Sequence, residues 1–273
     1  FGAQSPDGRK IRYYTPLEGN RIYWERDTYC CPNNFRRIIA ELPTMVYYRS
    51  GTGLTVSLYT ASDATIDLDG GVSLRVRQET DYPTSGHVVL HLDPSQPTTF
   101  PLKLRIPRWC DNATVAINGQ PWDKPIATGG FLAIEREWTA GEQVTLDMPM
   151  PWRLVLGRKR QSGRAAVMRG PVVFCLNPAQ NKELQNRDGA DLSYLMLDPS
   201  SLKDVPGGDT TVRPGGMACE ARFCTNPSEI WFKGGGIVFL KLTEFPDAEG
   251  KCVYFRLPDL SAAVPDELAL GEE

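Results

Sequence analysis

The sequence predicts a mainly β protein with two β-sandwich domains, preceded by a short helical segment. Apolar and polar residues alternate with a period of two in many short runs, which is typical of half-buried strands. These runs recur at spacings of roughly 10 to 15 residues, as in sandwich domains. The composition, with 41% hydrophobic and 23% charged residues in a chain of 273, is that of a globular protein and excludes a disordered, collagen-like or coiled-coil chain.

Residues 1–50 differ from the rest because they contain a helical pattern. Four apolar residues recur at the i, i+3, i+4 and i+7 positions of one helix face, and Pro43 should end or kink that helix. Pro32 suits the first turn, so Cys31 is the expected N-cap and Cys30 precedes it. The apolar face consists of Phe35, Ile38, Ile39 and Leu42.

Residues 51–156 carry the clearest alternation and form the first predicted sandwich. Asn118 and Gly119 supply the two positive-φ positions of a type I′ turn, which predicts a hairpin at that point. The expected strands lie around residues 54–58, 72–77, 88–92, 102–106, 115–117, 132–134 and 144–148.

Residues 157–273 form the second predicted sandwich. Pro149 and Pro151 cannot donate backbone hydrogen bonds and interrupt strand pairing, so we place a boundary near residue 156. Residues 177–216 are polar and rich in Pro and Gly, and we expect them to form long loops. The expected strands lie around residues 165–168, 172–176, 237–242 and 252–255.

Charge and hydropathy exclude several classes of partner. With 30 basic and 33 acidic side chains, the net charge is only −3, so no broad cationic surface would bind nucleic acid or an anionic membrane. No apolar run approaches the roughly 20 residues that span a bilayer, so we expect a soluble protein. The chain begins at Phe1 without an initiator Met or a signal peptide, and we expect a mature or truncated product.

The seven cysteines do not have the dense, even spacing of a disulfide scaffold, and most should be buried thiols. Cys30 and Cys31 are the exception, because a helix N-terminus and nearby cations favour a thiolate. A thiolate is a nucleophile and a soft metal ligand, and two adjacent sulfur atoms could supply two of the four ligands that zinc prefers. A vicinal pair at a buried helix start could equally be accidental. The nearby cations are Arg26, Arg36 and Arg37.

Other polar residues are weaker candidates. Glu25 and Asp27 precede the cysteine pair and could donate a proton or bind a metal, although solvated or Arg-paired carboxylates are more common. His87 and His91 are four residues apart, so on a strand they would share one face. A metal site is compatible with that spacing, but surface or cross-strand roles are more frequent. The segment before the cysteine pair is rich in aromatic residues that could stack on sugars or fill a core: Tyr13, Tyr14, Tyr23, Trp24 and Tyr29.

Several sequence blocks together resemble glycoside hydrolase family 127, the bacterial β-L-arabinofuranosidase family. The similarity runs from about Tyr13 to Leu176, and a weaker similarity is found at Lys241–Phe245 and Tyr254–Arg256. Six blocks in the family order are far more specific than the cysteine pair alone. The blocks are Tyr29–Ala40, Arg77–Pro83, Leu104–Trp109, Ala116–Gly119, Leu146–Pro151 and Arg169–Leu176.

The resemblance implies an N-terminal (α/α)6 barrel that holds the active site, followed by β-sandwich domains. Residues 1–50 would then be the C-terminal end of that barrel, a short helical remnant carrying Cys30 and Cys31. It also implies that Cys30 is the catalytic nucleophile and a zinc ligand, and that Cys31 is a second zinc ligand. The family's remaining ligands, from a Glu-x-Cys element, and its general acid/base lie upstream of the pair, and this chain contains no Glu-x-Cys. Asn33 stands where the family usually has a second proline.

We therefore predict a retaining, zinc-dependent glycosidase acting on L-arabinofuranose-containing glycans, with these 273 residues inactive alone. The cofactor would be zinc, with two ligands outside the chain. The compartment stays open between a bacterial cytoplasm and periplasm. The alternative is a non-catalytic β-sandwich module that binds carbohydrate or braces another domain. A second chain could also supply the missing barrel, and residues 35–42 would then form a subunit contact.

Overall fold

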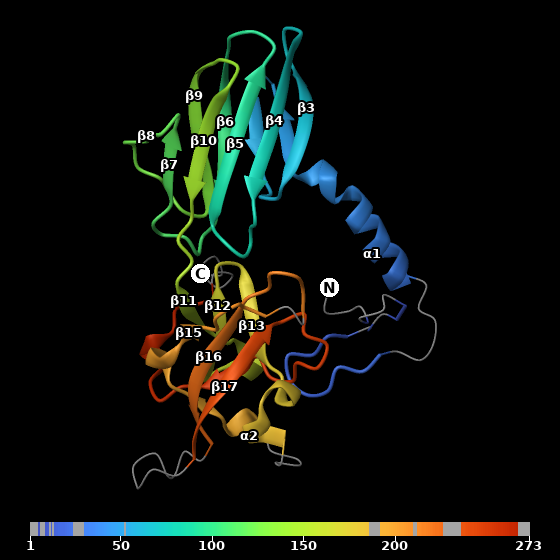
Figure 1. Cartoon of the computed structure of the whole chain (residues 1–273), viewed down its shortest axis with the longest axis vertical. Coiled ribbons are helices and arrows are strands. Elements are labelled where there is room, and N and C mark those ends of the chain that lie inside the picture. Colours follow the sequence, from blue (N-terminus) through green and yellow to red (C-terminus); the bar gives the residue numbers. More distant parts are fainter. Residues whose placement is uncertain are drawn as a thin grey trace. The chain divides into compact units, whose positions relative to one another are not determined.

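The computed structural model describes residues 5, 9–10, 12, 14–23, 30–51, 53–185, 192–209, 212–225 and 236–266. The chain divides into two compact units, one formed by Asn33–Met150 and the other by Phe1–Pro32 together with Pro151–Glu273 (Figure 1). The units therefore change at Pro151 rather than near residue 156, and residues 1–50 are divided between them. Their assignment to a catalytic barrel stays a prediction. The described ranges are mainly β, as predicted.

The predicted helix is present as α1 (Cys30–Glu41). It begins at Cys30, so Cys31 is its second residue and the predicted N-cap role is wrong. Pro32 lies in the first turn, where a missing N–H costs nothing. The helix ends before Pro43, which lies in the 3₁₀ turn Leu42–Met45. Much of its apolar face is exposed, with Ile38 at 53% and Ile39 at 45%.

The unit from Asn33 to Met150 contains two sheets that share one core. The first has the order β1 (Tyr47–Ser50), β2 (Gly53–Val56), β6 (Thr98–Ile106) and β9 (Gly130–Trp138). The second has the order β3 (Ser62–Leu68), β4 (Val72–Thr80), β5 (His87–Pro94), β10 (Glu142–Asp147), β7 (Thr114–Ile117) and β8 (Gln120–Pro121). Two sheets around one core are the arrangement of a β-sandwich.

Strand alternation produces this core, because every second side chain points inward. Burial alternates along β4 and β5, and β2 and β6 supply the facing layer. The Trp138 indole N–H donates to the Phe100 carbonyl at 3.0 Å, so this large buried side chain leaves no unpaired polar atom. β1 and β3 were not among the predicted strands. The core includes Leu54, Leu74, Leu90, Leu92, Phe100, Leu102, Leu104 and Val144.

In its described residues, the other unit contains a single sheet instead of the predicted second sandwich. Its order is β11 (Trp152–Leu156), β12 (Arg164–Arg169), β13 (Val172–Leu176), β17 (Ile237–Glu244), β16 (Ala218–Cys224), β14 (Met196–Leu197) and β18 (Tyr254–Arg256), and β15 (Lys203–Asp204) pairs with β16. Because β18 also pairs with β12, the strands β12, β13, β17, β16, β14 and β18 close into a six-stranded barrel.

The predicted second sandwich was wrong, and four strands of this unit were missed: β11, β14, β15 and β16. β14 and β15 lie inside the segment expected to be loops, and β16 follows it. β14 is two residues long, yet it bridges β16 and β18 and completes the ring. The remaining helices in the described ranges are short: α2 (Lys182–Gln185) and the 3₁₀ turns Lys159–Gln161, Pro178–Gln180, Leu192–Tyr194, Pro199–Ser201 and Leu260–Ala262. No described helix is both long and apolar enough to cross a membrane.

Candidate functional site

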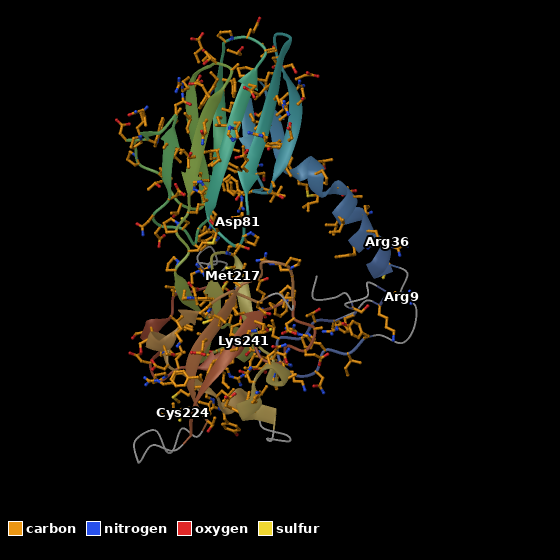
Figure 2. All side chains as sticks on the ribbon, viewed as in Figure 1. Arg9, Arg36, Asp81, Met217, Cys224 and Lys241 are labelled. Atoms are coloured by element: carbon orange, nitrogen blue, oxygen red, sulfur yellow. The ribbon has the colours of Figure 1, made fainter. Side chains whose placement is uncertain are left out.

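Cys30 occupies the first position of α1, and it is exposed. The positive end of a helix dipole favours negative charge at such a position. Of the predicted cationic neighbours, Arg36 (Figure 2) and Arg37 are exposed on the same helix. Arg37 lies 4.0 Å from the Glu41 carboxylate. The side chain of Cys31, and all of Glu25, Arg26, Asp27 and Tyr29, lie outside the described residues.

The other described cysteines contrast with Cys30. Burial raises the pKa of the Cys175 thiol to about 11 and that of the Cys219 and Cys252 thiols to about 12. It also raises the pKa of Cys110. A thiol with so high a pKa is almost wholly protonated near neutral pH and is a poor nucleophile. These four are the buried hydrophobes that the sequence predicted.

The described residues do not form a zinc site by themselves. No three His, Cys, Asp or Glu side chains in the described ranges lie close enough together to hold a metal ion. A structural or catalytic zinc needs at least three protein ligands. If Cys30 and Cys31 bind zinc, the remaining ligands must therefore come from outside the described part of the chain.

His87 and His91 share the outer face of β5, as predicted. His87 Nδ1 lies 2.6 Å from Asp147 Oδ1, and His91 Nε2 lies 3.4 Å from Glu79 Oε2. Each histidine thus faces a carboxylate on a neighbouring strand, and the two do not converge on one point. This is the cross-strand role that the spacing favoured.

The segment that leads to Cys30 is attached to the barrel unit. The backbone of Glu18 bridges to Cys252, and the Gly19 N–H donates to the Lys251 carbonyl at 2.9 Å. Arg164 and Glu18 form an ion pair. These contacts fix the chain to the sheet of the barrel unit a short distance before α1 begins.

Arg21 is the strongest side-chain anchor of this segment. Its guanidinium is buried, donates through Nη1 to the carbonyl oxygens of Phe245, at 2.5 Å, and of Asp247, and stacks on the Phe245 ring at 4.4 Å. Burial lowers the pKa of Arg21, although an arginine stays charged in proteins. Nothing in the local sequence distinguishes Arg21 from a surface arginine, so sequence reasoning did not select it.

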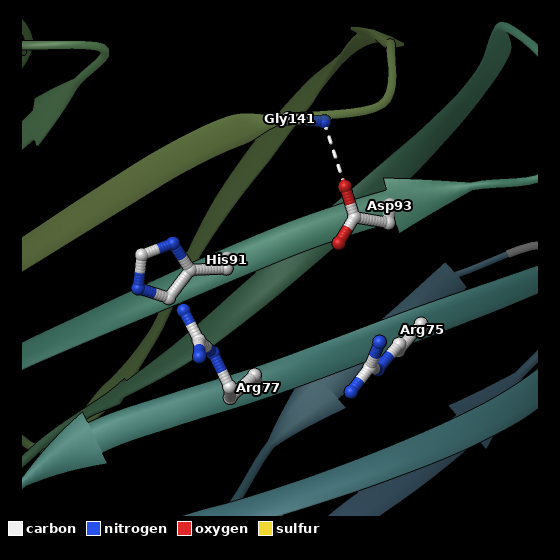
Figure 3. Close-up of a pocket in the computed structure, with 5 residues that line it drawn as sticks. All are labelled: Arg75, Arg77, His91, Asp93 and Gly141. Carbon is white, nitrogen blue, oxygen red and sulfur yellow. Dashed lines mark hydrogen bonds between the residues drawn. The ribbon is translucent and has the colours of Figure 1, made fainter.

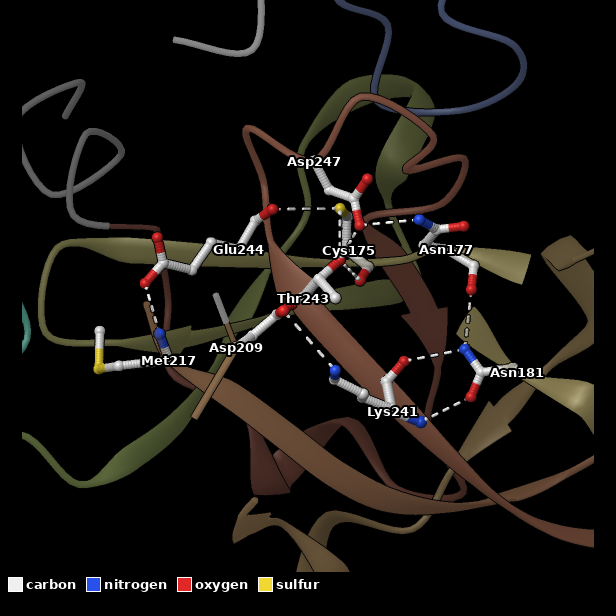
Figure 4. Close-up of polar contacts among 9 residues, drawn as sticks. All are labelled: Cys175, Asn177, Asn181, Asp209, Met217, Lys241, Thr243, Glu244 and Asp247. Carbon is white, nitrogen blue, oxygen red and sulfur yellow. Dashed lines mark hydrogen bonds and ion pairs between the residues drawn. The ribbon is translucent and has the colours of Figure 1, made fainter. Parts of the chain in front are cut away.

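Asp247, whose carbonyl accepts from Arg21, belongs to a buried polar cluster (Figure 4). Asp247 Oδ2 accepts from Asn177 at 2.8 Å and from the Thr243 hydroxyl at 2.7 Å. Asn181 donates to the Asn177 carbonyl at 2.8 Å and accepts from the Lys241 N–H at 2.7 Å. Because each of these buried groups has partners, the cluster fixes the loops of the barrel. Its members come from strand ends far apart in sequence, and no local motif could have identified it.

The comparisons with known proteins agree on one family. Residues 53–150 match the family model described as β-L-arabinofuranosidase, GH127 middle domain. A non-reducing end β-L-arabinofuranosidase from Bifidobacterium longum is 31% identical over 198 residues, which cover 65% of this chain and 30% of that protein.

Solved structures are similar over nearly the whole chain. A GH127 β-L-arabinofuranosidase from Geobacillus stearothermophilus is 27% identical, with a TM-score of 0.80, over 94% of this chain and 44% of that one. A structure described as a glycoside hydrolase is 26% identical, with a TM-score of 0.79, over 94% of this chain and 46% of that one. The chain thus spans less than half the length of each of these relatives. As its sequence motifs predicted, the chain is similar to glycoside hydrolase family 127, and residues 53–150 match the model of that family's middle domain.

Proposed function

We propose that this chain is the C-terminal portion of a retaining, zinc-dependent glycoside hydrolase that acts on β-L-arabinofuranosides, with Cys30 as its nucleophile. The observation that carries the proposal is the placement of Cys30, exposed at the first position of α1, while four other cysteines are buried. The similarity to family 127 β-L-arabinofuranosidases supports the substrate class.

The proposed chemistry is a double displacement. The sulfur of Cys30 attacks the anomeric carbon, an acid protonates the departing oxygen, and a glycosyl–sulfur bond forms. Water then attacks the same carbon, with the acid acting as base, and the sulfur leaves with its electron pair. Two inversions give net retention. A soft sulfur nucleophile takes the place that a carboxylate has in most glycosidases.

The acid/base group is proposed to lie in a preceding part of the complete protein. General acid help is worth roughly 10² to 10⁴ in rate. We therefore expect these 273 residues alone to be inactive. Zinc belongs to the same proposal: Cys30 and Cys31 would supply two sulfur ligands, and the preceding part of the protein would supply the other two.

Hydrolysis of an aryl β-L-arabinofuranoside tests the proposal, with the complete enzyme and the 273-residue chain assayed side by side. We expect activity only in the complete enzyme, and a loss of at least about 10⁴-fold on Cys30→Ala, as for removal of other nucleophiles. Cys224→Ala, which changes a half-exposed cysteine on β16, is the matched control and should leave the rate unchanged. Mass spectrometry of the denatured enzyme should detect a pentosyl adduct on Cys30.

Two results would contradict parts of the proposal. An active Cys30→Ala enzyme would exclude Cys30 as the nucleophile, and hydrolysis by the 273-residue chain would exclude a necessary acid/base outside it. Zinc analysis is separate: the complete enzyme should contain one zinc per chain and lose it on Cys31→Ser. A metal-free and fully active enzyme would exclude the zinc assignment.

A further inference from the structure

A hollow of about 340 Å³ lies on the outer face of the six-stranded sheet of the Asn33–Met150 unit (Figure 3). Its volume is within the range of about 300 to 1,000 Å³ that is usual for small-molecule sites. The lining residues are Arg75, Arg77, His91, Asp93 and Gly141. None of them contributes to the core, and none has a part in the proposed hydrolysis.

Strand register brings these residues together. In the antiparallel pair of β4 and β5, Arg77 lies opposite His91 and Arg75 lies opposite Asp93. Side chains directly opposite each other on one face have Cβ atoms roughly 5 Å apart. The turn before β10 closes one side, because the Gly141 N–H donates to Asp93 Oδ1 at 2.8 Å. The hollow is therefore built on two strands of a well-paired sheet rather than on loops.

Existing contacts hold the polar groups in place and leave part of their hydrogen-bonding capacity unused. Arg75 donates through Nε and Nη2 to the two carboxylate oxygens of Asp63, at 3.0 and 2.6 Å. Arg77 Nη2 lies 2.9 Å from Glu79 Oε1. With respect to the described residues, this leaves Nη1 of Arg75, Nη1 and Nε of Arg77, and Oδ2 of Asp93 available to a ligand. These anchored groups lose little side-chain entropy on binding.

The charge balance decides between an anionic and a neutral ligand. Among the Arg, Asp and Glu side chains here, two guanidinium groups are matched by three carboxylates, those of Asp63, Glu79 and Asp93. The local charge is therefore about −1, which does not attract an anion. The available groups combine guanidinium donors with a carboxylate acceptor. Neighbouring hydroxyl groups, each of which both donates and accepts, complement such a set.

We propose that this hollow is a non-catalytic binding site for a neutral monosaccharide, held through adjacent hydroxyl groups by Arg75, Arg77 and Asp93, with the His91 ring beside them. The site goes beyond the proposed hydrolysis and does not depend on Cys30. Among the residues that the structure describes, no Trp, Tyr or Phe lines it, so none of them offers a large aromatic face for stacking. The affinity should therefore be low, with a Kd on the order of 10 mM for a pentose.

The two histidines provide the test, because they are the only ones in the chain and share one strand. The ring signals of His91 and His87 are followed by NMR while L-arabinose is added to the 273-residue chain. The His91 signals should shift and saturate, and those of His87, held by Asp147 away from the lining residues, should not. Arg77→Met and Asp93→Asn should each raise the Kd about tenfold or more, and the control His87→Gln should leave it unchanged.

Three outcomes would overturn the proposal. One is the absence of a selective His91 shift up to about 100 mM sugar, well above the expected Kd. Another is an unchanged Kd in folded Arg77→Met and Asp93→Asn variants. The third is a shift caused by galacturonate but not by L-arabinose, which would indicate an anion site. None of these experiments measures hydrolysis. Their result is therefore independent of whether Cys30 is the nucleophile.

Discussion

At the scale of single residues, the barrel unit shows how a buried charge is tolerated. Glu244, at the end of β17, has a side chain that is only 3% exposed. Arg213 donates through Nε and Nη2 to its two oxygens, each at 2.7 Å, and the Met217 N–H adds a third hydrogen bond at 2.8 Å. These three donors replace the hydrogen bonds that the buried carboxylate would make with water.

Removing Arg213 should therefore be costly, because it leaves the Glu244 carboxylate buried without its countercharge. Arg213→Met is expected to lower the free energy of unfolding by about 3 kcal/mol, at the low end for a broken buried pair because Arg213 is a third exposed. Urea denaturation measures this. Arg222→Met, which breaks the more exposed pair with Asp198, should cost less than about 1 kcal/mol. Equal losses in the two variants would refute this account of Glu244.

At the scale of single elements, the hairpin between β7 and β8 follows directly from local chemistry. Asn118 and Gly119 have φ angles of 50° and 77°, as a type I′ turn requires. The Asn118 side chain also accepts from the Gln143 N–H at 2.8 Å and donates to Glu142 Oε1 at 3.0 Å. The turn that the sequence predicted is thus fixed to β10 by contacts that the sequence did not reveal.

Two glycines of the same unit should respond oppositely to substitution. Gly119→Ala is expected to destabilise the protein by about 1 to 2 kcal/mol, since a Cβ is disfavoured at positive φ. Gly130→Ala, at the first residue of β9, should be neutral or stabilising by roughly 0.5 to 1 kcal/mol, because alanine lowers the conformational entropy of the unfolded chain. A Cβ would meet no atom within 4 Å at either site. Thermal denaturation of both variants checks the signs, and a stabilising Gly119→Ala would contradict the turn assignment.

At the scale of the whole molecule, the chain has separate hydrophobic cores. The core of the Asn33–Met150 unit draws all its buried residues from positions 54–148. The main core of the barrel unit draws its own from positions 154–257. Each unit therefore has the apolar interior that independent folding requires.

The fragment 33–150 should consequently fold alone. We expect one cooperative urea transition, with a slope of roughly 1 to 3 kcal/mol/M, and dispersed amide signals by NMR. The shorter fragment 33–141 lacks β10, which pairs with both β5 and β7, and should be unfolded. A disordered 33–150 fragment would show that its core depends on the rest of the chain.

The sequence by itself determined the mainly β class, the helix before Pro43, most strands of the Asn33–Met150 unit and the hairpin at Asn118. These features depend on local alternation, proline stereochemistry and positive φ, all of which a short window of residues contains. The motif order also predicted the similarity to glycoside hydrolase family 127, and with it the role proposed for Cys30.

Only the tertiary structure decided how the barrel closes and which polar groups meet. Met196 and Leu197 close the ring, although a strand of two residues is too short to show an alternating pattern. β16 is placed in the barrel by its pairing with β17 on one side and β14 on the other. Arg21 reaches the carbonyl oxygens of residues more than two hundred positions away. Arg77 and His91 face each other because of strand register. Such contacts arise from pairing between distant segments, and a local pattern does not encode which segments will pair.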